Sequence, residues 1–277
     1  MANEDARLSA LAAGTLLGCG VFTSLGIWNR RAFALDRHMA RLQRDAARMQ
    51  IDLPFPTEHI NEVLQELISR ENIFRGMARI TLTARGDGRW NKTDGSDLSI
   101  IAQSTTEFRT DGSSTAVAEF PPLKLTFSPY RIEARRALAG VKSTSYGDAL
   151  LAWREACARG FDEAIVCNSQ GVLCEGTRSN LFWVRDGELR TPSLDTGCLP
   201  GIARELVLKW AHAERVRVRE GSYSPSEIPG ADEVFLTSAA SGPRGVSLLD
   251  MSGQEEIFTT VGATTKRFQE LWAEATA

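Results

Sequence analysis

The chain has 277 residues, 43% of them hydrophobic and 24% charged, and a formal net charge of −3. This length and composition are typical of a globular protein with a sizeable core, divided into about two domains. The small net charge gives no reason to expect nucleic acid or an anionic membrane as a partner. The five cysteines and three histidines form no metal-binding pattern, so no metal site is predicted.

The apolar run at residues 8–22 has only part of the character of a signal peptide. The residues before it include Glu4 and Asp5 against a single Arg7, whereas a signal peptide begins with a net positive charge. No segment is long and apolar enough to span a bilayer. The cysteine usage fits reduced thiols, so we expect a soluble, cytoplasmic protein.

The first part of the chain, residues 1–120, is predicted to be a small N-terminal domain. Residues 20–29 alternate like a strand and turn at 29–31 into an amphipathic helix at 33–51, for which Asp36 is the expected cap. Thr57 is the expected cap of a second helix. Further elements are expected as a helix at 58–70, strands at 76–86, 98–104 and near 116–120, and polar loops at 86–97 and 108–116.

The second predicted domain spans residues 121–277 and begins after Pro121-Pro122. Lys142 precedes a helix with an apolar stripe that includes Leu150 and Cys157, and Gly160 ends that helix. The other expected elements are a strand at 123–129, hairpins at 164–176 and 180–191, a helix after Pro200-Gly201, a strand at 215–223, a strand running into a small-residue loop at 231–246, and a helix at 259–275.

Three features of this domain have the chemistry that pyridoxal phosphate needs. The amine of Lys142 can form a Schiff base, and the strand residue Glu175 can keep the pyridine nitrogen protonated. The first amides of the helix at Ile202 and Ala203 can bind the phosphate. Each feature alone is more often structural, as a solvated lysine or an edge glutamate, so the residues alone leave both interpretations open.

Together, three segments resemble the signature of the class IV pyridoxal-phosphate aminotransferases. They are EGTRSNLF (175–182), LRT (189–191) and GCLPGIAR (197–204), and the resemblance extends back to Lys142 and forward to residues 236–242. It implies fold type IV, an α+β architecture with a small α/β N-terminal domain and a larger, β-barrel-like C-terminal domain. The family includes branched-chain aminotransferases, D-amino-acid aminotransferases and aminodeoxychorismate lyases.

The resemblance implies a role for each matching residue. Lys142 is the expected catalytic lysine, which binds the cofactor and transfers the substrate's α-proton. Glu175 is expected at the pyridine nitrogen. Tyr146, which shares a helical face with Lys142 if the helix has begun there, is expected at the phenolic oxygen. The other expected cofactor-binding residues are Arg41, Asn180, Gly201, Ile202, Ala203, Ser238 and Ala239, and the expected substrate-binding residues are Phe22, Arg89 and Ala240.

The N-terminal edge departs from the family pattern. Relatives usually begin with an extra strand and have an acidic residue in a G-D-G turn, whereas this chain has Cys19 at that position. Either the first strand is missing, or residues 1–17 replace it. The R-x-H substrate motif of the D-amino-acid enzymes has only a partial counterpart at residues 89–91.

Three functions remain open from the sequence. The first is amino transfer between an amino acid and a 2-oxo acid, which Tyr146 favours. The second is the lyase reaction that forms 4-aminobenzoate and pyruvate, which residues 20–25 and 79–89 favour. The third is a non-catalytic protein with this fold, against which the retention of Lys142, Glu175 and Arg41 argues. The expected partners are a small amino-acid or oxo-acid substrate and a second copy in a homodimer.

Overall fold

The structure is a computed structural model that describes residues 7–87, 90, 94–104, 120–251, 253–258 and 261–277. It divides the chain into two compact units, one of Met1–Thr105 with Val141–Tyr146 and one of Thr106–Gly140 with Gly147–Ala277. The predicted loop at 108–116, most of the predicted strand near 116–120, and Arg89 lie outside the described residues. The predicted boundary between residues 120 and 121 borders that stretch and stays a prediction.

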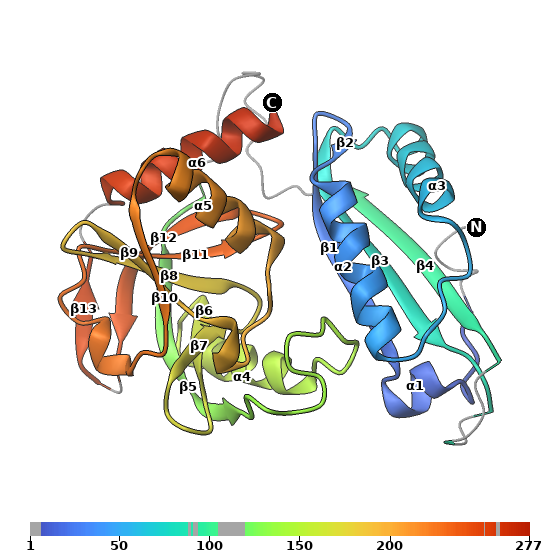
Figure 1. Ribbon diagram of the computed structural model, residues 1–277, viewed down its shortest axis with the longest axis horizontal. Coiled ribbons are helices and arrows are strands. Elements are labelled where there is room, and N and C mark those ends of the chain that lie inside the picture. The colour runs from blue at the N-terminus through green and yellow to red at the C-terminus, as the bar shows by residue number, and fades with distance from the viewer. Residues whose placement is uncertain (1–6, 88–89, 91–93, 105–119, 252, 259–260) are drawn as a thin grey trace. The chain divides into compact units, whose positions relative to one another are not determined.

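The first unit contains an antiparallel sheet whose order is β2-β1-β3-β4 among the described residues (Figure 1). The strands are β1 (Gly20–Trp28), β2 (Arg31–Ala32), β3 (Arg75–Ala84) and β4 (Ser96–Ser104). The helices are α1 (Ala13–Leu17), α2 (Leu35–Arg48) and α3 (Thr57–Arg70). Alternate residues of β3 are buried, including Ala78, Ile80 and Leu82, as expected of a strand with one face on a core. The core-facing side chains of α2 include Met39 and Leu42.

The hairpin between β1 and β2 confirms the turn predicted at residues 29–31. Asn29 and Arg30 both have positive φ, of 48° and 64°, which is the backbone geometry of a tight two-residue hairpin. The predicted caps of the next two helices are wrong. The residue that caps α2 is Ala34, in the left-handed region, and Asp36 lies in the first turn. Thr57 is the first residue of α3 and follows its cap, Pro56.

The N-terminal residues that the structure describes form α1 rather than an additional strand. This short helix packs on β3, and a Cβ at Gly14 would lie 2.6 Å from the Cβ of Thr83. Only a glycine allows so close an approach of the two segments. The region that differs from the family pattern is therefore helical from Ala13 to Leu17.

The second unit contains a mixed sheet in the order β10-β9-β8-β11-β12-β5-β6-β7, with β13 paired to β12, as far as its residues are described. The strands are β5 (Leu123–Ile132), β6 (Glu163–Asn168), β7 (Leu173–Gly176), β8 (Asn180–Arg185), β9 (Glu188–Pro192), β10 (Arg217–Gly221), β11 (Glu233–Ser238), β12 (Gly242–Asp250) and β13 (Glu255–Ile257). The terminal strand β7 also contacts β8 and β9, so the sheet curls. The curled sheet and the mixture of helices and strands confirm the predicted α+β fold.

Side chains of β8 alternate between two hydrophobic clusters. Leu181 and Trp183 belong to one cluster, and Phe182 joins Phe235 and Phe268 in the other. The helices of this unit are α4 (Gly147–Ala158), α5 (Ile202–Ala213) and α6 (Ala263–Thr276), with short 3-10 turns at Leu194–Thr196 and Pro225–Glu227. Phe268 lies on α6, which packs on β11 and β12 (Figure 1). The alternation therefore lets β8 contribute to the core on both faces of the sheet.

The apolar stripe predicted for α4 is partly wrong. Leu150 is 43% exposed and Cys157 is also exposed, whereas the buried residues of the helix are Ala152 and Ala156. Small side chains let α4 lie close to β5 and β6. Gly160 ends the helical region with a φ of 87°, as predicted.

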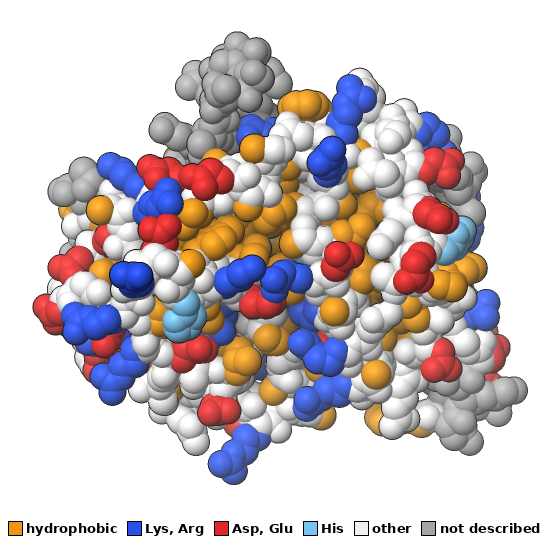
Figure 2. Space-filling model, turned by 45° about the horizontal axis from the view of Figure 1, so that its top comes forward, with side chains coloured by type: hydrophobic (Ala, Val, Ile, Leu, Met, Phe, Trp, Pro, Cys, Tyr) orange, Lys and Arg blue, Asp and Glu red, His pale blue; other side chains and the backbone are white. Residues whose placement is uncertain are grey.

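Charged side chains of both signs are interspersed over the face shown in Figure 2. That distribution agrees with the small formal net charge of −3. Within the described part of the chain, no helix has both the length and the hydrophobicity needed to cross a membrane.

Candidate functional site

Lys142 lies on an extended segment and not on a helix. The segment Val141–Tyr146 runs beside the start of β1, where the Phe22 amide donates to the Lys142 carbonyl at 2.9 Å and the Thr144 amide donates to Gly20 at 2.8 Å. Helix α4 begins only at Gly147. The expectation that Lys142 and Tyr146 share one face of a helix is therefore wrong, because both residues precede the helix.

The two side chains nevertheless meet. The Lys142 Nζ donates a hydrogen bond of 3.1 Å to the Tyr146 hydroxyl, and the amine lies 4.7 Å from the ring centroid of Phe22. The Phe22 and Tyr146 rings contact each other edge to face at 5.2 Å. The guanidinium of Arg79, on β3, lies 3.6 Å from the Phe22 centroid. The Lys142 amine is therefore bonded to the Tyr146 hydroxyl and lies near the Phe22 ring. The Arg79 guanidinium is a second cation on that same ring.

Arg41 lies on the buried face of α2 and is only 5% exposed. Its Nη2 donates to the Thr23 hydroxyl at 3.0 Å, and that hydroxyl is 2.7 Å from Nδ1 of His38. Burial lowers the pKa of Arg41 to about 10, and the negative charge of Asp45 offsets part of that lowering. Arg41 therefore remains a cation at neutral pH, inside the first unit.

His38 is fully buried and neutral. Burial, with the nearby charges of Arg41 and Lys142, lowers the pKa of His38 to about 3. The Thr23 hydroxyl accepts from Arg41, and its contact with Nδ1 of His38 is a hydrogen bond whose donor depends on the imidazole tautomer. The resulting series of bonds fixes the orientation of Arg41 from the side of β1.

Asp45 completes this cluster on α2 and is 1% exposed. Its Oδ2 accepts from the backbone N–H of Lys142 at 3.0 Å, and its Oδ1 accepts from the Arg44 guanidinium at 2.8 Å and 3.1 Å. The sequence analysis gave no role in the site to Thr23, His38 or Asp45. A usable signal was present, because the polar residues His38, Arg41 and Asp45 share one face of α2 with buried apolar side chains.

In the second unit, Glu175 on β7 is half-buried and points at the loop before α5. Its Oε2 accepts a hydrogen bond of 2.9 Å from the Leu199 amide. Asn180 donates to the carbonyl of the same residue at 2.8 Å. A Cβ at Gly201 would lie 2.1 Å from the Asn180 Oδ1, so a larger residue there would displace the Asn180 side chain. These contacts fix the course of the chain immediately before the helix.

The start of α5 has the form of an anion site. Its cap is Gly201, with no side chain bonded to the first turn, so the first helical amides at Ile202 and Ala203 have no partner within the helix. The turn between β11 and β12 carries Ser238, whose hydroxyl is 2.9 Å from that of Ser241, and then Ala239 and Ala240, both half-buried. The neighbouring Thr237 hydroxyl is buried and has no hydrogen-bond partner among the residues that the structure describes.

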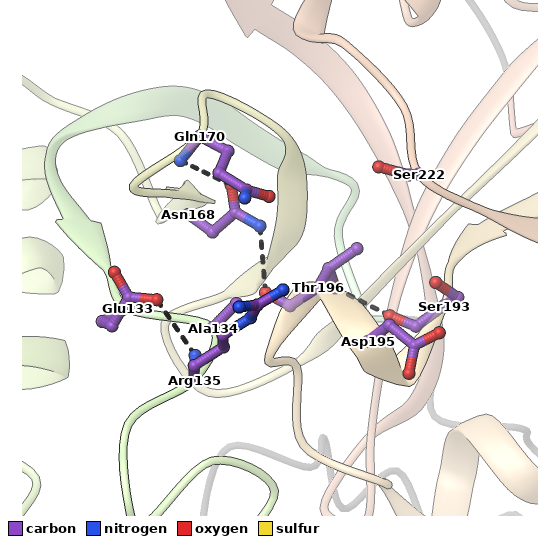
Figure 3. Close-up of a pocket in the computed structure, with 9 residues that line it drawn as sticks. All are labelled: Glu133, Ala134, Arg135, Asn168, Gln170, Ser193, Asp195, Thr196 and Ser222. Atoms are coloured by element: carbon purple, nitrogen blue, oxygen red, sulfur yellow. Dashed lines mark hydrogen bonds between the residues drawn. The ribbon is translucent and has the colours of Figure 1, made fainter.

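A polar hollow of about 280 Å³ lies elsewhere in the second unit (Figure 3). Its lining includes Glu133, Arg135, Asn168 and Thr196, and none of the predicted site residues. Its polar groups bind one another, since the Asn168 amide donates to the Thr196 carbonyl at 3.2 Å and the Arg135 backbone N–H donates to Glu133 at 3.0 Å (Figure 3). The bond to Thr196 ties Asn168, at the end of β6, to the residue before Gly197.

Comparisons with known proteins identify the family of this chain. The family model described as amino-transferase class IV matches residues 20–249. The "Putative branched-chain-amino-acid aminotransferase" of Methanocaldococcus jannaschii is 30% identical over 96% of this chain and 90% of its own length. The aminodeoxychorismate lyase of Bacillus subtilis is 30% identical over 86% of this chain and 80% of its own.

A solved structure gives the same result for the fold. The branched-chain aminotransferase from Thermoproteus uzoniensis, solved with norvaline, superposes with a TM-score of 0.86 and 24% identity, covering 99% of this chain and 91% of that one. The family match spans most of the chain, including both groups of residues described above. The chain belongs to the class IV aminotransferases, a family of pyridoxal-phosphate-dependent enzymes that includes aminodeoxychorismate lyases.

Proposed function

We propose that this protein binds pyridoxal 5'-phosphate on Lys142 and transfers an amino group between an amino acid and a 2-oxo acid. The observation that carries the proposal is the contact between the Lys142 amine and the Tyr146 hydroxyl in a cluster that also contains the buried Arg41. When bound, the cofactor supplies an electron sink that makes the α-proton of an amino acid acidic. The family membership of the chain supports the same cofactor.

The residues around Lys142 suit it for moving that proton. Its Nζ would accept the α-proton from the substrate, and the Tyr146 hydroxyl would hold the amine in place between transfers. Phe22 provides an apolar wall beside the amine. Arg79, stacked on Phe22, offers a cation for a substrate carboxylate, a role expected from the sequence for Arg89. Ala240 is proposed as a further substrate contact.

The second unit would supply the contacts to the cofactor ring and phosphate. Glu175 would hold the proton on the pyridine nitrogen, and its bond to the Leu199 amide fixes the carboxylate for that task. The phosphate would bind the first amides of α5, with Arg41 as the cation and Ser238 and Ala239 as further contacts. The uncapped helix start and the unpaired Thr237 hydroxyl fit an oxygen-rich anion. Asn180 would shape the loop through Gly201.

Borohydride reduction in the presence of pyridoxal phosphate, followed by peptide mass mapping, tests the cofactor assignment. The label should fall on Lys142 and disappear in Lys142→Ala. Lys124 and Lys209 serve as internal controls, since both lie on other elements. A label on either of them, or no label on any lysine, would overturn the proposal.

The lyase reaction is the second candidate, favoured by the identity to the Bacillus subtilis aminodeoxychorismate lyase. Purified protein supplied with an amino acid and 2-oxoglutarate should release a new 2-oxo acid if it is an aminotransferase. Supplied with aminodeoxychorismate, it should release pyruvate and 4-aminobenzoate if it is a lyase. The ratio of kcat/KM for the two reactions decides between them.

We also propose that the protein is a homodimer, because class IV aminotransferases are generally dimeric. Sedimentation at micromolar concentration should then give about twice the mass of the 30.4 kDa chain. A fully active monomer would exclude a requirement for the dimer. The cytoplasmic location stays an expectation, and fractionation of cells expressing the protein would test it.

A further inference from the structure

Asp45 is a buried carboxylate inside the first unit, at a position where an unpaired charge would be strongly destabilising. It is only 1% exposed, on the buried face of α2, which also carries Met39, Leu42 and the polar residues His38 and Arg41. Both of its oxygens are engaged, one by the Arg44 guanidinium and the other by the main chain of Lys142. Its side chain therefore has a fixed position set from two sides.

The bond to Lys142 completes the fixation of that residue's backbone. The Lys142 carbonyl accepts from Phe22 of β1, while its N–H donates to Asp45 of α2. The peptide groups on both sides of the lysine Cα are thus tied to two different elements. Because the side chain extends from this Cα, the direction in which the amine leaves the backbone depends on both bonds.

The same carboxylate also acts on Arg41, one turn earlier on α2. Burial favours the neutral form of Arg41, and the charge of Asp45 opposes that effect. The other charged or titratable groups facing the cluster are His38 and Arg44 on α2, Tyr146 beside Lys142, and Arg79 on β3. Asp45 is the acidic member among these groups.

We propose that Asp45 is a positioning residue of the active site, holding the Lys142 backbone in place through its hydrogen bond to the Lys142 amide. This inference rests on the proposed function, in which Lys142 binds the cofactor. The hydrogen bond should govern the lysine end of the cofactor. The negative charge of Asp45, in contrast, lies one helical turn from Arg41 and should not favour binding of the phosphate.

Two substitutions separate these effects. Asp45→Asn keeps an oxygen that can accept from the Lys142 amide but removes the charge, whereas Asp45→Ala removes both. Asp36→Asn is the matched control, because Asp36 lies on the same helix with an exposed side chain. The probes are pyridoxal 5'-phosphate and pyridoxal, which lacks the phosphate, each added to full-length protein freed of cofactor.

The dissociation constants of the two probes give the expected pattern. Asp45→Asn should bind pyridoxal within about twofold of the wild type, because it keeps the acceptor for the Lys142 amide, and should bind pyridoxal phosphate at least as tightly, because a negative charge near Arg41 is gone. Asp45→Ala should weaken pyridoxal by about tenfold or more, because the acceptor is lost. Asp36→Asn should leave both probes unchanged. If Asp45→Ala binds pyridoxal like the wild type, or if Asp45→Asn weakens pyridoxal as much as Asp45→Ala does, the proposal is wrong.

Hydrogen exchange gives a readout without cofactor. The backbone amide of Lys142 should exchange at least tenfold faster in Asp45→Ala than in the wild type, and unchanged exchange there would overturn the positioning role. If Asp45→Ala does not fold, Asp45→Leu, which fills a similar space without an acceptor, takes its place in both measurements. A wild-type protein that binds neither probe on Lys142 refutes the proposed function itself, and the exchange rate then reports the hydrogen bond alone.

Discussion

Acidification should destabilise the protein through one residue, His38. Its pKa in the folded protein is about 3, well below the ordinary value of 6.5, because burial and the neighbouring cations disfavour the imidazolium. The unfolded chain takes up a proton near pH 6.5 and the folded chain does not. The contribution of neutral His38 to stability is therefore complete above pH 6.5 and is lost as the pH falls towards 3.

The magnitude follows from the size of this pKa difference. Each pH unit between the two values reduces the free energy of unfolding by about 1.4 kcal/mol, so lowering the pH from 7.5 to 5.0 should remove about 2 kcal/mol. His38 is fully buried, so solvent does not screen the effect. In His38→Asn, the side-chain amide can replace Nδ1 as the hydrogen-bond partner of the Thr23 hydroxyl without titrating. The variant should lose this part of the pH dependence.

Denaturant unfolding of both proteins at pH 7.5 and 5.0 measures the effect. The difference in free energy of unfolding between wild type and His38→Asn should shift by about 2 kcal/mol in favour of the variant at the lower pH. Proton NMR of the imidazoles, with the exposed His59 and His212 as reference signals, should show His38 still neutral at pH 5. A His38 signal that titrates near pH 6.5 in the folded protein refutes the reasoning.

Three further substitutions test other parts of the molecule. Glu175→Gln should lower turnover about a hundredfold while cofactor occupancy changes much less, as measured by steady-state kinetics and absorbance; near wild-type turnover would place the carboxylate's role elsewhere. Gly201→Ala should destabilise the protein by about 1–3 kcal/mol, because its Cβ meets Asn180, whereas Gly147→Ala, with nothing within 4 Å, should be neutral in thermal unfolding. Glu233→Ala should cost about 2 kcal/mol, since Glu233 accepts from the Thr264 and Thr265 amides at the start of α6; a denaturation midpoint as little changed as that of the exposed Glu255→Ala would argue against this cap.

The sequence predicted most elements whose turns have distinctive residues. The hairpin of β8 and β9 turns at Asp186-Gly187, both with positive φ, as the sequence indicated. Strand β12 was only partly predicted, because Gly242, Pro243 and Gly245 were interpreted as a loop. In the structure these residues pair with β11, and Gly242 allows close contact with Trp272 on α6. That contact joins residues far apart in the chain, which local patterns do not reveal.

Prediction of the site from the sequence was limited in the same way, by contacts between residues far apart in the chain. The motif residues Lys142 and Glu175 were identified from their neighbours in sequence, and the structure places each next to a fixed loop or strand. Asp45 was not identified, because an acidic residue on an amphipathic helix is usually solvated. Its burial depends on Arg44 and on a backbone amide 97 residues away. No local propensity encodes that pairing.

The placement of Val141–Tyr146 has a consequence for dissecting the protein. The polypeptide passes between the two units three times, so one cut cannot separate them without dividing the first. A fragment ending at Thr105 would keep Arg41 and Asp45 but lose Lys142, and it would leave the edge of β1 at Gly20 and Phe22 without its hydrogen-bonded neighbour. An independently expressed first unit therefore needs those six residues rejoined to it by a designed linker, as in a circular permutant.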